Sequence, residues 1–100
     1  MVQLIFDPEA LLEIREAVAF YEQSKPGLGK SFLTVIEKAS LEISQHPLFW
    51  RQIKGKFRRY LILGFPYGII YAVEKNTVYI AAIMHLKRKP GYWIARARNR

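Results

Sequence analysis

The apolar residues of this chain change their spacing once, near residue 50, and that change limits the fold more than any other feature. From residue 8 to residue 46 they recur every three or four positions, which is the period of a helix buried on one side. Residues 57–85 instead contain dense runs of β-branched and aromatic residues, which are typical of strands, and residues 2–6 form a similar run. This order predicts an α+β fold, an antiparallel sheet with an N-terminal strand and a helical hairpin packed on one face.

The ends of the two helices are marked by capping and breaking residues. Asp7 and Pro8 predict an N-cap followed by a proline in the first turn. The segment Ser-Lys-Pro-Gly at 24–27 ends this helix, and the second begins near Leu28 and stops before Pro47. We expect one apolar stripe on the first helix, formed by Leu11, Ile14, Val18 and Tyr21. Two helices joined by so short a break fold back as an antiparallel hairpin.

Three strands are expected in the second half, at residues 57–63, 67–73 and 77–85. Gly-Phe-Pro at 64–66 separates the first two, and a tight turn at 74–76 separates the last two. The last run is almost continuously apolar, which predicts a central strand covered on both faces.

Length and composition favour one cytoplasmic domain. One hundred residues provide a single core, so we expect one domain over residues 1–100 with a basic tail from about residue 95. The chain has no cysteine, which excludes disulfides, thiol catalysis and cysteine-bound zinc. The apolar start is too short for a signal peptide, and no uncharged run is long enough to span a bilayer.

Charge is divided unevenly between the two halves. Residues 1–50 contain four Lys or Arg and seven Asp or Glu, a balance of −3. Residues 51–100 contain twelve basic residues and a single acid, Glu74, a balance of +11. This asymmetry predicts one electropositive face that would bind a nucleic acid, a nucleoprotein or an acidic protein segment.

The cations of the second half form two clusters with aromatic residues between them. The first cluster is Arg51, Lys54, Lys56, Arg58 and Arg59. The second is Lys87, Arg88, Lys89, Arg96, Arg98 and Arg100. The rings among them are Phe57, Tyr60, Tyr92 and Trp93. Cations beside rings are the ingredients of single-stranded RNA binding. Composition favours the simpler interpretation, a solvated basic surface whose rings face the core.

Other chemistry has less support in the sequence. His85 closes an apolar strand beside Lys87 and Arg88, where an imidazole suits general acid–base catalysis, although a hydrogen-bonded histidine at a strand end is more common. Its only counterpart, His46, is distant in sequence, so the two make a poor metal site, and we expect no metal and no cofactor. Most acidic residues are expected to solvate the outward faces of the helices.

Short stretches in a fixed order cover nearly the whole chain. They are residues 8–10, 17–22, 26–29 with Phe32, Ile43 with Pro47, 65–67 with 70–71, and 85–90 with Trp93. In this order and spacing they resemble the RelE/ParE toxin superfamily of type II toxin–antitoxin systems. The resemblance implies the fold described above and a toxin silenced by a cognate antitoxin in a hetero-oligomer. It also implies one of two targets, messenger RNA on the ribosome for RelE-like members or DNA gyrase for ParE-like members.

The ribonuclease branch would use cations and rings of this chain as its active site. The resemblance assigns these roles to Arg58, Arg59 and Arg88, with Tyr92 or Trp93 as the aromatic partner, and His85 is a further candidate. An arginine is also expected just after Tyr67, but Gly68 stands there. Loss of one such charge-stabilising donor typically lowers a rate by about 10²–10³-fold. Whether the chain is an enzyme is therefore open.

Residues 65–67 and 85–90 look more like the ParE branch, so we expect a gyrase inhibitor, with an mRNA endoribonuclease as the alternative. The residues expected to contact the target are Arg58, Arg59, Lys87, Arg88, Trp93 and Arg96. An inert relative that only binds its antitoxin is a third hypothesis. The antitoxin is expected to be acidic and amphipathic, covering an apolar groove beside the helix pair by helix docking or strand addition.

Overall fold

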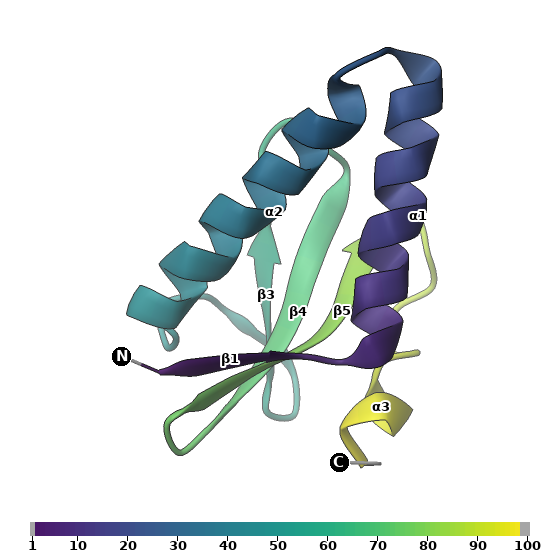
Figure 1. The fold of residues 1–100 in the computed structure, drawn as a ribbon. Helices are drawn as coiled ribbons and strands as arrows, with labels where there is room; N and C mark the ends of the chain where they lie inside the picture. The colour runs from purple at the N-terminus through teal and green to yellow at the C-terminus, as the bar shows by residue number, and fades with distance from the viewer. Residues whose placement is uncertain (1, 99–100) are drawn as a thin grey trace.

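A computed structural model describes residues 2–98, with side chains as far as Arg96. Its elements are β1 (Gln3–Phe6), α1 (Pro8–Ser24), α2 (Leu28–Gln45), β2 (Gln52–Lys54), β3 (Phe57–Leu61), β4 (Tyr67–Glu74), β5 (Thr77–His85) and α3 (Ile94–Arg98). The helices α1 and α2 form a hairpin across one face of a five-stranded sheet (Figure 1). The α+β prediction is confirmed.

The sheet has the strand order β1-β5-β4-β3-β2 and is antiparallel except at one pair. There β1 runs parallel to β5, with Gln3 opposite Thr77 and Phe6 opposite Ile80. A parallel pair needs a long connection, and the helices and three strands between β1 and β5 provide it. The sheet is therefore mostly antiparallel, as expected, with one parallel pair whose direction the sequence did not predict. As predicted, β5 is an interior strand buried on both faces, although β4 occupies the middle of the sheet.

Two elements were absent from the sequence prediction. The strand β2 is only three residues long, too short to show a period, and it is paired to β3 through an irregular register. The helix α3 lies in the segment expected to be a basic tail. Residues 99–100 of that tail lie outside the described part of the chain.

A bulge in β5 determines which side chains share a face. Ile70 of β4 pairs with Ala82 and Tyr71 pairs with Ile80, which leaves Ala81 without a partner in the register. Because of this extra residue, Ala81 and Ala82 both belong to the apolar cluster on the side away from the hairpin, whereas Ile80 belongs to the helix side. The sheet thus has two buried faces. One lies under the hairpin, and the other lies under the C-terminal segment, residues 86–98.

The hairpin begins as its sequence predicts, and a glycine allows its two helices to pack closely. The Asp7 side chain caps α1 by accepting a 2.8 Å hydrogen bond from the Glu9 amide, and Pro8 occupies the first turn. Near the start of α2, a β-carbon on Gly29 would lie 2.6 Å from the carbonyl oxygen of Val18, so only glycine allows the helices to approach this closely. Within residues 2–98, no helix is long and apolar enough to cross a membrane.

Candidate functional site

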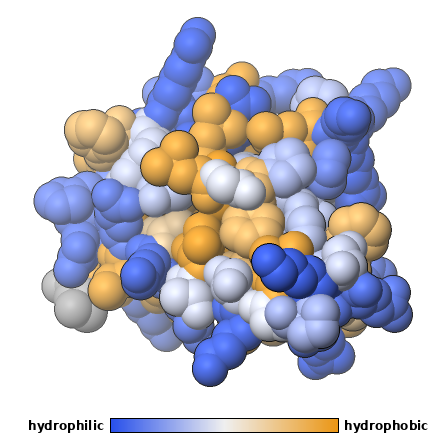
Figure 2. Space-filling view, turned by 90° about the horizontal axis from the view of Figure 1, so that it is seen from above, coloured by the Kyte–Doolittle hydropathy of each residue, from blue (hydrophilic) through white to orange (hydrophobic). Residues whose placement is uncertain are grey.

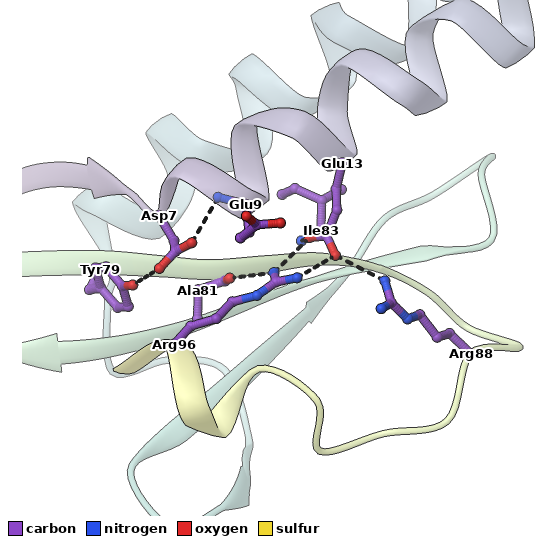
Figure 3. A network of polar contacts seen from close by, with 8 residues as sticks. All are labelled: Asp7, Glu9, Glu13, Tyr79, Ala81, Ile83, Arg88 and Arg96. Atoms are coloured by element: carbon purple, nitrogen blue, oxygen red, sulfur yellow. Dashed lines mark hydrogen bonds and ion pairs between the residues drawn. The ribbon is translucent and has the colours of Figure 1, made fainter. Parts of the chain in front are cut away.

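The carboxylate of Glu13 on α1 accepts hydrogen bonds from three residues of other elements (Figure 3). Its Oε1 accepts hydrogen bonds from the Ile83 amide at 2.9 Å and from Arg96 Nη1 at 3.0 Å. Its Oε2 accepts from Arg96 Nη2 and from Arg88 Nη1, each at 3.1 Å. The side chains of Glu13 and Arg96 are only 11% and 13% exposed. One carboxylate therefore joins α1, β5 and the C-terminal segment.

This arrangement compensates for the early end of β1. The last bond between the strands is donated by the Asp7 amide to the Ile80 carbonyl, and beyond it β5 has no strand on that side. Buried backbone groups there need other partners. Glu13 accepts from the Ile83 amide, and Arg96 donates to the carbonyl of the bulged Ala81 at 3.0 Å. Glu13 and Arg96 thus bond backbone groups of β5 that a neighbouring strand would otherwise bond.

The expectation that the acids lie on the outward helix faces was wrong for Glu13. It follows Ala10 by three residues and precedes Ala17 by four, and both alanines are buried, so it lies on the inner face of α1. Leu11, expected in the apolar stripe, is instead 46% exposed. The spacing of the small residues was the sequence signal that could have shown this.

Tyr92 lies beside the two arginines that share Glu13. The guanidinium carbon of Arg88 is 3.6 Å from the ring centroid, and that of Arg96 is 4.8 Å from it. Burial and the neighbouring Glu13 raise the pKa of the Tyr92 hydroxyl above its ordinary value. Two cations therefore lie close to this ring, which leaves less room for a stacked base.

The structure places Arg58 and Arg59 on opposite faces of the sheet. On the helix side, Arg58 Nη1 donates to the carbonyls of Leu48 at 3.2 Å and Trp50 at 2.7 Å, which holds the loop after α2. On the other side, the stem of Arg59 lies over Gly68, where a β-carbon would be 3.2 Å from Arg59 Cγ. Because Gly68 has no side chain, the stem of Arg59 can lie directly over it.

The remaining predicted site residues are divided between the two faces of the sheet, although His85 and Arg88 line one hollow together. Trp93 is only 1% exposed and packs with Phe57 on the face away from the hairpin. His85 lies on the helix side, edge-on to Tyr67, and its Nδ1 accepts a hydrogen bond from the Lys87 amide at 3.1 Å. The exposed Lys87 follows in the turn after β5. Of the second cation cluster, the Arg98 side chain and Arg100 lie outside the described residues.

Several hollows lie on the surface of the described residues, and two of them differ clearly in the chemistry of their lining. The basic hollow, about 340 Å³, is lined by Ile53, Lys54, Arg59, Met84, Pro90, Gly91 and Trp93. The apolar groove, about 370 Å³, is lined by Leu4, Phe6, Leu11, Ile14, Leu33, Ile36, Glu37, Ser40 and Leu41. Figure 2 looks onto the end of the molecule that carries the connection between α1 and α2, and shows apolar side chains ringed by hydrophilic ones.

Comparison with known proteins decides the family. A family model for the ParE toxin of type II toxin–antitoxin systems (parDE) matches residues 4–90. The chain belongs to the ParE toxin family. A search of curated proteins gave no match. A chain in the solved structure of the chromosomal ParDE TA system from P. aeruginosa superposes with a TM-score of 0.66 at 11% identity, covering 87% of this chain and 98% of that one. At this identity the likeness shows the fold.

Membership of the ParE family confirms the expected branch of the superfamily and makes the protein a toxin of a type II system, which implies an antitoxin partner. The matched segment ends at Pro90, so Tyr92, Trp93 and Arg96 lie beyond it. The ParE family match therefore does not extend to the part of the C-terminal segment that Glu13 holds.

Proposed function

We propose that this ParE toxin arrests growth by binding DNA gyrase in the cytoplasm, without catalysis of its own, and that its antitoxin silences it by covering the apolar groove. The observation that supports a non-catalytic role is the separation of Arg59 and Trp93 from His85 and Arg88, which line a different hollow. His85 and Arg58 lie on the helix side of the sheet, and Arg59 lies on the other. General acid–base chemistry requires these groups within hydrogen-bond reach of one substrate.

The states of the individual side chains support the same conclusion. Arg88 and Arg96 share the one carboxylate of Glu13, which compensates one of their two positive charges. Trp93 is buried, and the Tyr92 ring is close to both guanidinium groups. Recognition of single-stranded RNA needs free rings and uncompensated cations at one place. Neither ring predicted for this role, Tyr92 or Trp93, is both exposed and beside a cation without an acidic partner.

The target is tested by inducing the chain alone in bacteria and following labelled thymidine and labelled amino acids during the first minutes. We expect thymidine incorporation to stop first and cells to form filaments. Purified protein should also inhibit supercoiling by gyrase while leaving messenger RNA in translating ribosomes intact. Early arrest of amino-acid incorporation with cleaved message would contradict the proposal and support the ribonuclease alternative. Unimpaired growth despite abundant protein would identify an inert antitoxin-binding relative.

The apolar groove is the surface best suited to an amphipathic antitoxin segment. Eight of its nine lining residues are apolar or small, and Leu11, Leu33 and Leu41 on its walls are each more than a third exposed. An exposed apolar groove between two helices and an edge strand is typical of a site that receives a partner helix. Because β1 is an edge strand beside the groove, strand addition is also available there.

Replacing Leu33 and Leu41 together by glutamate should abolish rescue by the antitoxin while leaving toxicity intact. Two charges placed among apolar contacts are expected to weaken the complex by about 100-fold or more. The readouts are the dissociation constant by calorimetry and growth during co-expression. Leu63→Glu is the matched control, because Leu63 is 90% exposed and lies outside the groove. Equal rescue of the double variant and the control would place the antitoxin elsewhere.

A further inference from the structure

The basic hollow holds cations that the rest of the chain does not compensate. Among residues 2–98, Arg88 and Arg96 pair with Glu13, Lys56 pairs with Glu74, and Arg58 binds loop carbonyls. Lys54 and Arg59 have no carboxylate or carbonyl partner among those residues, and both line the hollow. No acidic residue lines it. Two free charges at one concave place favour an anionic ligand.

The position of Arg59 is restricted by its neighbour. Its stem lies over Gly68, whose absent side chain leaves 3.2 Å and 3.3 Å from the site of a β-carbon to Arg59 Cγ and Cδ. Arg59 is itself half-buried on β3, whereas Lys54 is exposed at the edge strand β2. An arginine whose stem is packed loses less conformational freedom when its guanidinium binds a ligand. The hollow is thus partly preorganised.

The rest of the lining restricts the kind of anion. Ile53, Met84, Pro90 and Trp93 give the hollow an apolar lining, so a ligand that fits it carries methylene groups next to its charge. A glutamate side chain has this composition, and an isolated phosphate does not. A nucleotide would need an exposed ring for its base, but Trp93 is 1% exposed and no other aromatic residue lines the hollow.

We propose that the basic hollow is a binding site for a glutamate side chain in an acidic peptide segment of a protein partner, with the carboxylate on Arg59 and Lys54 and the methylene groups on the apolar lining. The planar guanidinium of Arg59 suits a two-pronged hydrogen bond to the carboxylate, and Lys54 adds a point charge from the sheet edge. The site lies on the face of the sheet away from the hairpin, so it is separate from the apolar groove. The proposal does not depend on gyrase being the target.

The test measures binding of a fluorescent Glu-Leu repeat peptide to the purified chain by anisotropy. We expect saturable binding that is weakened about tenfold or more by Arg59→Ala, and also by Lys54→Ala, because each removes one charged contact. Lys38→Ala is the matched control, since it removes the same charge from the exposed face of α2 and should leave the affinity unchanged. Gly68→Ala keeps every charge but displaces the stem of Arg59, so it should weaken binding severalfold.

Four outcomes would overturn the proposal. A Gln-Leu peptide that binds as well would mean that only apolar contacts matter. Equal weakening by Lys38→Ala would mean that net charge alone attracts the peptide. Tighter binding of an oligouridylate through Arg59 and Lys54 would assign the hollow to nucleic acid. No saturable binding of any of these probes would show that the hollow has no anionic ligand of these classes. Circular dichroism of each variant distinguishes misfolding from a binding defect.

Discussion

Replacing Trp93 by alanine is expected to lower the free energy of unfolding by about 3–5 kcal/mol, the range for removing a large buried aromatic side chain. Trp93 is among the largest fully buried side chains, and it fills the face of the sheet away from the hairpin. Its removal leaves a cavity against Phe57, Ala82 and Met84. Urea denaturation followed by circular dichroism measures the loss. Phe49→Ala, at a side chain that is 79% exposed, should change stability by less than about 0.5 kcal/mol.

This prediction changes how a toxicity assay at Trp93 is interpreted. The sequence placed Trp93 among the residues that contact the target, and a loss of toxicity in the alanine variant would agree with that role. The same loss is expected from unfolding, because a small domain has only about 5–15 kcal/mol of stability in total. Only a variant that keeps its stability and still loses toxicity would show direct contact with the target, and that result would contradict the burial seen here.

Replacing Glu13 by alanine is expected to cost about 3 kcal/mol or more, because it leaves Arg96 largely buried without its carboxylate. The Ile83 amide loses its acceptor in the same step. The C-terminal segment should loosen as well, since Arg96 and Arg88 both reach α1 through this side chain. Faster tryptic cleavage after residue 86, together with a lower urea midpoint, is the expected readout.

Glu16→Ala provides the control for Glu13→Ala. Glu16 lies three residues further along α1 and is exposed, so its removal should change the urea midpoint little. If both variants unfold at the same urea concentration as the parent, the network in Figure 3 contributes nothing measurable, and α3 is held by its apolar contacts alone.

The parts of the fold that local sequence determines were predictable. The Asp-Pro cap, the Ser-Lys-Pro-Gly break and the change of apolar period predicted the two long helices and four of the five strands close to their observed ends. The parallel pairing of β1 with β5 was not predictable, because a strand's direction relative to a distant strand depends on the path of the whole chain. β2 and α3 are too short to produce a period.

The candidate site was less predictable, and for a specific reason. Arg58 and Arg59 are adjacent, so in a strand they point to opposite faces, and a list of basic residues does not separate them. Glu13 lies 70 residues from its partner Ile83 and 83 from Arg96, a distance at which sequence gives no sign of contact. The charge balance showed that cations were in excess. Only the contacts show which of them an acid already compensates.

The glycine at position 68 has a consequence for how this surface can change. The stem of Arg59, on the neighbouring strand, occupies the volume that a side chain at 68 would need. In a Gly68→Arg variant, two long side chains would therefore compete for the same space. One of them would have to turn away from this face of the sheet. Residues 59 and 68 are therefore coupled across two strands, since a side chain added at position 68 requires the stem of Arg59 to shift.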